Sequence, residues 1–311
     1  MAIARVLPGR DNRPLEHAGD TGVSPLSRPA RQTGMPMTTS AHITGFDHLV
    51  ILVKDLESAQ RRYSQLGFRL SPRNRHPQSS TANHVAVFQR DYLELLTVTQ
   101  ADALNQPLAD LLEQGGDGLR MLALGSADAE AAKAHLQAQA IDAFGPFALS
   151  RKGPGAQGGE VELLFNVLLP QAVGAPLEAQ LFFCQHLTPE RVYQADAPAH
   201  PNSALGVRAI TVPVADLQPV ESRLRALAGG DAYRRQDDAL ELNTGSAPLR
   251  FVATAHWPHG QASGLVSFDS ADLDATRDWL RSANIAFEEL GEAIRIAADD
   301  AHNVVLEFQA S

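Results

Sequence analysis

The sequence contains one cysteine, Cys184, in 311 residues. A disulfide framework within the chain is therefore excluded, and a reducing compartment such as the cytoplasm is expected. Aromatic residues make up only 6% of the chain, which argues against a protein that sequesters ligands by aromatic stacking. No stretch approaches the roughly 18 consecutive apolar residues of a membrane-spanning helix. The formal net charge of −10 argues against nucleic-acid binding, because phosphate recognition needs a basic surface.

The first 43 residues also lack apolar periodicity. They contain arginine, proline and glycine without the apolar core of a secretory signal. We expect residues 1–43 to be a disordered arm, because they offer no apolar face that could offset the entropy lost on ordering.

The rest of the sequence contains a repeat. An apolar strand, an aspartate and an amphipathic helix follow one another four times, over residues 46–70, 118–141, 207–228 and 264–287. The aspartates are Asp55, Asp128, Asp216 and Asp272. Aspartate is a favoured N-cap, because its side chain accepts hydrogen bonds from the first turn of a helix. Each unit closes with another apolar strand, so the sequence predicts a repeat architecture.

The four units are expected to group in two pairs. Residues 190–204 are rich in proline and alanine and only weakly periodic, as a linker should be. The predicted domains are therefore residues 44–190 and residues 205–311.

His48 and Glu94 are polar residues inside two apolar strands of the first unit. Burial of an imidazole and a carboxylate is costly unless a partner is present, and a divalent metal is one such partner. The plainer interpretation is a hydrogen-bonded core histidine and an outward-facing glutamate. The position of His48, seven residues before the helix-opening aspartate, is occupied in the other units by Met121, Ala209 and Leu265. The first pair of units is therefore the expected site.

The closing strands of the four units can also be compared. The residues expected to correspond to Glu94 are Gln185 or His186 in the second unit, Arg250 or Phe251 in the third, and Glu307 in the fourth. The last two units have no histidine at these positions, so the second domain is expected to have a degenerate site.

Four βαβββ units in a row resemble the vicinal oxygen chelate superfamily, which includes glyoxalase I, bleomycin-resistance proteins and extradiol dioxygenases. Residues 75–77, 81–84, 183–189 and 200–202 resemble its glyoxalase-like branch in particular. The resemblance implies an α+β fold in which modules pair as curved mixed-sheet half-barrels around a metal and a small substrate. The metal of four-module extradiol dioxygenases lies in the C-terminal pair, so an N-terminal site departs from that group.

The ligand set expected from the residues and the resemblance is His48, Glu94 and His186 around one divalent ion. Gln185 is the alternative to His186, because neighbouring side chains of a strand point to opposite faces. Two histidines and one carboxylate suit Fe, Mn, Ni or Zn, and the ligands alone do not choose among them.

Other polar residues are candidates for contact with a substrate. His84 is the expected proton-transfer residue, because histidine titrates near neutral pH. Asn83, His76, Gln185 and Arg151 are candidate substrate contacts. A turn cap for Asn83 and His84, and a solvated loop for His76 and Arg151, are the plainer interpretations.

These features predict a metal-dependent enzyme of glyoxalase type, a lyase or isomerase, acting on a small oxygen-bearing substrate. A non-haem Fe(II) dioxygenase and a metal-independent small-molecule binding protein are the alternatives. The expected partners are the small-molecule substrate and, as one option, a second copy of the chain, but no nucleic acid and no membrane.

Overall fold

The computed structural model describes residues 37, 39–76, 78–102, 105–155, 158–171, 179–194 and 199–311. Residues 37–311 form one compact unit. The arm predicted over residues 1–43 lies outside the described residues as far as residue 36. None of the helices in the described part of the chain is long and apolar enough to cross a membrane.

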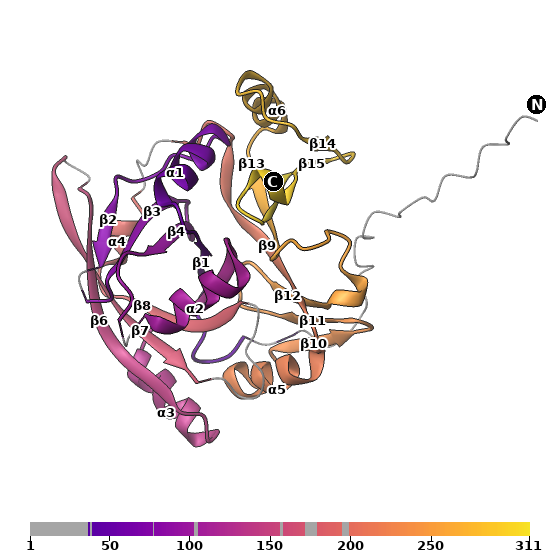
Figure 1. Ribbon diagram of the computed structural model, residues 1–311. Helices are drawn as coiled ribbons and strands as arrows, with labels where there is room; N and C mark the ends of the chain where they lie inside the picture. Colours follow the sequence, from indigo (N-terminus) through magenta and orange to yellow (C-terminus); the bar gives the residue numbers. More distant parts are fainter. Residues whose placement is uncertain are drawn as a thin grey trace, which may run out of the picture. The chain divides into compact units, whose positions relative to one another are not determined.

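The first half of this unit forms one sheet, coloured indigo to pink in Figure 1. Its strand order is β2-β3-β4-β1-β5-β8-β7-β6. The strands are β1 (Gly45–Leu52), β2 (Asn74–His76), β3 (Thr81–Val87), β4 (Tyr92–Val98), β5 (Gly118–Gly125), β6 (Ala143–Pro154), β7 (Glu160–Pro170) and β8 (Gln180–His186). β1 pairs with β4 in parallel and with β5 antiparallel, and β5 pairs with β8 in parallel. Two βαβββ modules therefore join through their opening strands.

The second half repeats this arrangement with the order β10-β11-β12-β9-β13-β16-β15-β14. The strands are β9 (Ala204–Val214), β10 (Tyr233–Gln236), β11 (Ala239–Leu242), β12 (Leu249–Ala253), β13 (Leu265–Ser270), β14 (Glu288–Glu289), β15 (Ala293–Ile296) and β16 (Val305–Ala310). The predicted α+β fold of four modules in two pairs is confirmed.

The helices begin where the sequence predicted. Asp55, Asp128, Asp216 and Asp272 are the N-caps of four helices, and each carboxylate accepts a hydrogen bond from the first turn. The helices are α1 (Leu56–Gln65), α2 (Gln106–Gly115), α3 (Ala129–Ala138), α4 (Pro189–Val192), α5 (Leu217–Ala228) and α6 (Leu273–Ser282), with short turns η1 (Thr254–His256) and η2 (Ala298–Asp300). Figure 1 shows α1 and α3 outside the curved first sheet.

The register of the central strands relates the two modules of the first half. His48 lies opposite Ala123 and Val50 lies opposite Met121 across β1 and β5. Superposition of the second module on the first therefore places Met121 at the position of His48. The seven-residue spacing to the helix-capping aspartates predicted this correspondence. In the second half, Leu265 pairs with Thr211 and Ser267 with Ala209 in the same way.

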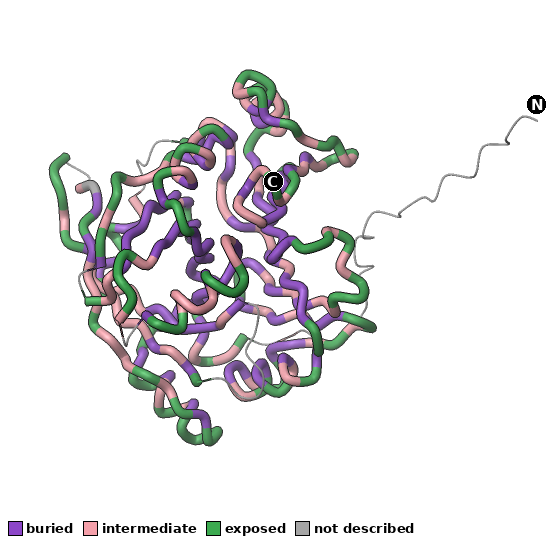
Figure 2. The backbone as a smooth tube through the Cα atoms, viewed as in Figure 1, coloured by how far each residue is buried: buried purple, intermediate pink, exposed green. Residues whose placement is uncertain are grey.

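The two halves also contact each other through polar side chains. Trp279 Nε1 of α6 donates to the carbonyl of Gln65 at 2.9 Å. Asn202 Nδ2 donates to the Leu66 carbonyl at 3.0 Å, and His200 bridges the Arg69 amide and the Val87 carbonyl at 3.0 Å each. Figure 2 shows that burial is concentrated along the central strands. The segment around residues 200–202 therefore docks the second half onto α1 and β3.

Candidate functional site

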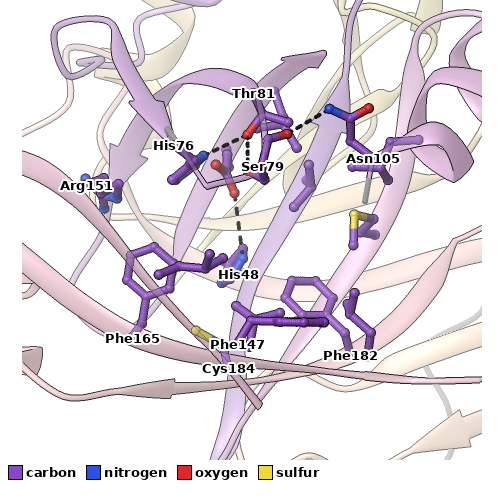
Figure 3. Close-up of a pocket in the computed structure, with 18 of the residues that line it drawn as sticks. His48, His76, Ser79, Thr81, Asn105, Phe147, Arg151, Phe165, Phe182 and Cys184 are labelled. Carbon is purple, nitrogen blue, oxygen red and sulfur yellow. Dashed lines mark hydrogen bonds and ion pairs between the residues drawn. The ribbon is translucent and has the colours of Figure 1, made fainter. Parts of the chain in front are cut away.

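A pocket lies on the inner face of the first sheet (Figure 3). Because side chains alternate along a strand, alternate residues of β1, β4, β6, β7 and β8 face it, and β2, β3 and β5 contribute one residue each. It has about 130 Å³ of water-accessible volume and suits a small ligand. The lining residues are His48, Val50, His76, Ser79, Thr81, Tyr92, Glu94, Leu96, Asn105, Leu108, Met121, Phe147, Leu149, Arg151, Phe165, Val167, Leu169, Phe182 and Cys184.

His48 is the central polar residue of this pocket. Its ring stacks on Tyr92 with 4.2 Å between the ring centroids. Its Nδ1 lies 2.6 Å from Asp47 Oδ1. The pairing of β1 with β5 shifts register between Phe46 and His48, and this irregularity accompanies the contact between two consecutive side chains. Asp47 therefore orients the His48 ring so that Nε2 points away from Asp47.

The carboxylate of Asp47 holds two histidines at once. His186 Nε2 lies 3.1 Å from the same Oδ1 atom that His48 contacts. Burial raises the pKa of Asp47, but hydrogen bonds and charge from His186 and His48 outweigh it and hold the pKa below its usual range. An ionised carboxylate only accepts hydrogen bonds, so His48 Nδ1 and His186 Nε2 are the donors. His48 Nε2 then carries the lone pair when the ring is neutral.

Glu94 faces His48 Nε2. Its Oε2 lies 3.7 Å from His48 Nε2, and its Oε1 accepts a hydrogen bond from Asn83 Nδ2 at 2.5 Å. Both residues are nearly buried, at 4% exposure for His48 and 7% for Glu94. Two acceptor atoms held face to face in a buried site are stabilised by a proton or a cation between them. Metal ligands are usually oriented by outer hydrogen bonds, as Asp47 and Asn83 orient this pair.

The position of His186 differs from the sequence alignment. His48 lies beside Tyr92 in the parallel pairing of β1 with β4, and Met121 lies beside Gln180 in the pairing of β5 with β8. Glu94, two residues beyond Tyr92, therefore corresponds to Phe182 and not to Gln185 or His186. Spacing along the chain does not predict this position, because it depends on how β8 pairs with β5. The second module thus contributes Met121 and Phe182, which are apolar, at the two matching positions.

The expected convergence of three ligands is seen for two of them. His48 and Glu94 face each other, while His186 Nε2 points to Asp47. Among the described residues, the group whose ligand atoms all lie within 4.8 Å is Asp47, His48 and Cys184. Burial, and the charges of Asp47 and Glu94, raise the pKa of the Cys184 thiol well above its usual value. A coordinating metal ion lowers the pKa of a thiol, so Cys184 stays a candidate ligand beside Asp47 and His48.

His76 and Arg151 also reach the pocket (Figure 3). His76 Nδ1 lies 3.0 Å from Thr81 Oγ1. Burial lowers the pKa of His76, Glu94 raises it, and Arg151 and His48 lower it further; the net pKa is below the usual value, so the ring is neutral at pH 7. Arg151 is 5% exposed, and its guanidinium carbon lies 5.9 Å from the centroid of the Tyr92 ring.

Four of the predicted site residues do not line the pocket. Asn83 and His186 contact Glu94 and Asp47, while His84 and Gln185 face elsewhere. His84 contacts the Ser71 carbonyl through its Nδ1 at 2.8 Å. It stands one residue after Asn83 on β3, so alternation turns it to the other face of the sheet. Gln185 likewise turns outward, where its Oε1 contacts the Ala129 amide at 3.3 Å at the start of α3. Neither His84 nor Gln185 is placed for the role expected of it.

Comparison with known proteins agrees with this architecture. The family model described as "Glyoxalase-like domain" matches residues 46–228, which is more than half of the chain. The chain belongs to the glyoxalase-like domain family. The predicted resemblance to the glyoxalase-like branch of the vicinal oxygen chelate superfamily is therefore confirmed. No curated protein matches the chain.

Solved structures similar to this glyoxalase-like protein show the same fold. A hypothetical protein from Staphylococcus aureus is 15% identical, with a TM-score of 0.59, over 86% of this chain and 99% of its own. A mutant of 4-hydroxymandelate synthase from Streptomyces coelicolor is 13% identical, with a TM-score of 0.52, over 87% of this chain and 94% of its own. Similarity at identities this low establishes the fold alone. The activity has to be inferred from the residues of the site.

The second half of the glyoxalase-like protein has a different inner face. By register, the four positions of His48, Glu94, Met121 and Phe182 correspond to Ala209, Arg250, Leu265 and Glu307. Glu307 is 7% exposed, and its Oε2 pairs with Arg295 Nη2 at 2.8 Å. This glutamate has a charged protein partner, whereas Glu94 faces His48 across an open 3.7 Å gap.

Sequence reasoning missed Asp47 and the aromatic wall. Alternation along β1 predicts that Asp47 and His48 face opposite sides of the sheet, so no sequence pattern pairs them. Tyr92, Phe147, Phe165 and Phe182 line the pocket, while other aromatic residues such as Phe68 and Phe268 pack in the core. The low aromatic content of the whole chain therefore did not predict that aromatic residues line the pocket.

Proposed function

We propose that this pocket is the active site of a metal-dependent enzyme acting on a small oxygen-bearing substrate. The observation that carries the proposal is the pair of buried acceptors, His48 Nε2 and Glu94 Oε2, separated by 3.7 Å. This separation is shorter than the roughly 4.2 Å spanned by two metal–ligand bonds of about 2.1 Å. One ion could therefore contact both atoms.

The hydrogen bonds that orient His48 and Glu94 also fit a site for a divalent ion. Asp47 fixes the tautomer of His48, and Asn83 fixes the rotation of Glu94. When bound, such an ion acts as a Lewis acid that polarises a substrate oxygen. The neutral nitrogen and the carboxylate suit Fe, Mn, Ni or Zn, and the metal identity stays open.

We assign proton transfer to His76 in place of His84. His76 lines the pocket with a neutral ring at pH 7, and Thr81 positions its Nδ1. A neutral imidazole can take a proton from carbon or oxygen and return it elsewhere on the substrate. This role favours a lyase or an isomerase over a dioxygenase, because both depend on proton movement.

The test is metal binding by matched variants. Protein freed of metal would be titrated with Mn(II), Co(II), Ni(II) and Zn(II) by calorimetry, and the protein as isolated would be analysed for bound metal. We expect about one ion per chain, lost in Glu94→Gln and His48→Gln. Glu307→Gln, which alters the buried glutamate on the closing strand of the fourth module, should bind as the wild type does.

Cys184→Ser separates the two possible groupings of ligands. It should keep the ion if His48 and Glu94 hold it, and lose the ion if Asp47, His48 and Cys184 do. A wild-type protein that binds none of these ions, or a Glu94→Gln variant that binds as well as wild type, would overturn the proposal.

A metal-independent binding protein is the second candidate. It is supported by the apolar residues Met121 and Phe182 at the positions where the second module would supply ligands. In that case small apolar compounds would bind with affinities that neither chelator nor Glu94→Gln changes.

A further inference from the structure

Arg151 is a buried cation in the pocket without a counter-charge. It lies on β6, is 5% exposed, and lines the pocket together with Phe147 and Leu149 of the same strand. Within the described part of the chain, its guanidinium makes no hydrogen bond or ion pair, and its contact is with the ring face of Tyr92. Arg295 in the second half differs, because it pairs with Glu307 at 2.8 Å.

A guanidinium held in this way favours an anionic ligand. Burial of an unpaired charge is strongly unfavourable, and a partner that brings its own negative charge removes that cost. Tyr92 lies against the guanidinium, with 5.9 Å between Arg151 Cζ and the ring centroid, and no described residue accepts a hydrogen bond from its donors. Protein carboxylates do not fill this role, because Glu94 already faces His48 and Asn83.

The remaining lining limits the size and charge of the ligand. Most of it is aliphatic or aromatic, including Val50, Leu96, Phe165 and Phe182. Arg151 is the only lysine or arginine among the lining residues described, and Glu94 contributes a negative charge to the same cavity. A dianion such as a phosphate monoester would face one cation and one carboxylate. A carboxylate matches the planar fork of one arginine and carries one charge.

We propose that the pocket binds an apolar monocarboxylate, with its carboxylate on Arg151 and its hydrocarbon part on the apolar wall. The inference rests on the proposed function in taking this pocket as the substrate site, but it does not require a metal. In this arrangement the reacting oxygen of the substrate lies toward His48 and Glu94, and the carboxylate is a separate anchor.

The experiment is a calorimetric titration with phenylacetate, hexanoate, the neutral isostere phenylacetamide and the dianion phenyl phosphate. Wild-type protein should bind at least one of the two carboxylates about tenfold or more tightly than the amide and the phosphate, as loss of a charged hydrogen-bond partner implies. Arg151→Gln should remove this preference, and Arg151→Lys should keep part of it. Arg61→Gln, which alters an exposed arginine of α1 outside the pocket, controls for general attraction of anions.

The outcomes separate this inference from the metal proposal. Glu94→Gln that loses metal but keeps carboxylate binding supports both. Carboxylate binding that depends on Arg151 in a protein without any metal affinity supports this inference alone. The inference is overturned if neither carboxylate binds, if the amide binds equally well, or if binding is lost in Glu94→Gln but kept in Arg151→Gln. Circular dichroism would establish that each variant is folded, and Arg151→Lys serves if Arg151→Gln is not.

Discussion

Asp91 should make the stability of this protein fall as the pH rises toward neutrality. It lies in the turn before β4, is 6% exposed, and its Oδ1 accepts a hydrogen bond from the Val207 amide at 3.0 Å. Burial raises the pKa of Asp91 from 3.8 to about 7, against the lowering by the Val207 hydrogen bond and Arg90, and with a further rise from Asp47 and Asp269.

The sign and size follow from proton linkage. Between pH 3.8 and about 7 the folded protein holds a proton on Asp91 that the unfolded chain has lost, so the free energy of unfolding falls as pH rises through this window. Above about pH 7 Asp91 is ionised in both the folded and the unfolded state. Its buried charge then lowers the free energy of unfolding by about 4 kcal/mol, at ~1.4 kcal/mol per pKa unit. Asp91→Asn removes the charge and keeps an oxygen for the Val207 amide.

The assay is urea unfolding of wild type and Asp91→Asn at pH 5 and pH 8, followed by circular dichroism. The difference in free energy of unfolding between Asp91→Asn and wild type should be about 3 kcal/mol more favourable to the variant at pH 8 than at pH 5. Asp231→Asn, which alters an exposed aspartate, should show the same stability difference at both values. A gain for Asp91→Asn that is equal at pH 5 and pH 8 would refute the reasoning.

Three further results are expected. Gly67→Ala should lower the thermal midpoint by several degrees, because φ is +87° and the added Cβ would lie 2.7 Å from Trp279 Nε1; about 2 kcal/mol or more would be lost. A chain that starts at Met37 should keep the wild-type thermal midpoint, and a large decrease would show that the arm docks on the fold. His76→Gln should lower kcat more than it raises KM. It should also reduce the loss of stability as pH falls below about 6.5, where the unfolded chain takes up a proton that the buried ring resists.

The fold could be predicted from the sequence because local and global signals agree. Each of the helix-capping aspartates follows an apolar strand, and the same seven-residue spacing identified Met121 as the counterpart of His48. His48 and Glu94 were found as polar residues in apolar strands. His186 was misaligned because the register of a closing strand depends on its pairing with β5, which spacing along the chain does not encode. Asp47 was missed because a local irregularity of β1 overrides alternation.

The chemical difference between the two modules also has a stereochemical consequence. A site built equally by two related modules would look nearly the same to a molecule and to its end-to-end reversal. Here one module supplies His48 and Glu94, while the other supplies Met121 and Phe182 at the matching positions and Arg151 on β6. Three chemically different contacts from different strands define a handed environment. Such a pocket can hold one enantiomer of a chiral acid with its reacting group against His48 and Glu94. The other enantiomer, bound through the same contacts, would place a hydrogen or a methyl group against them.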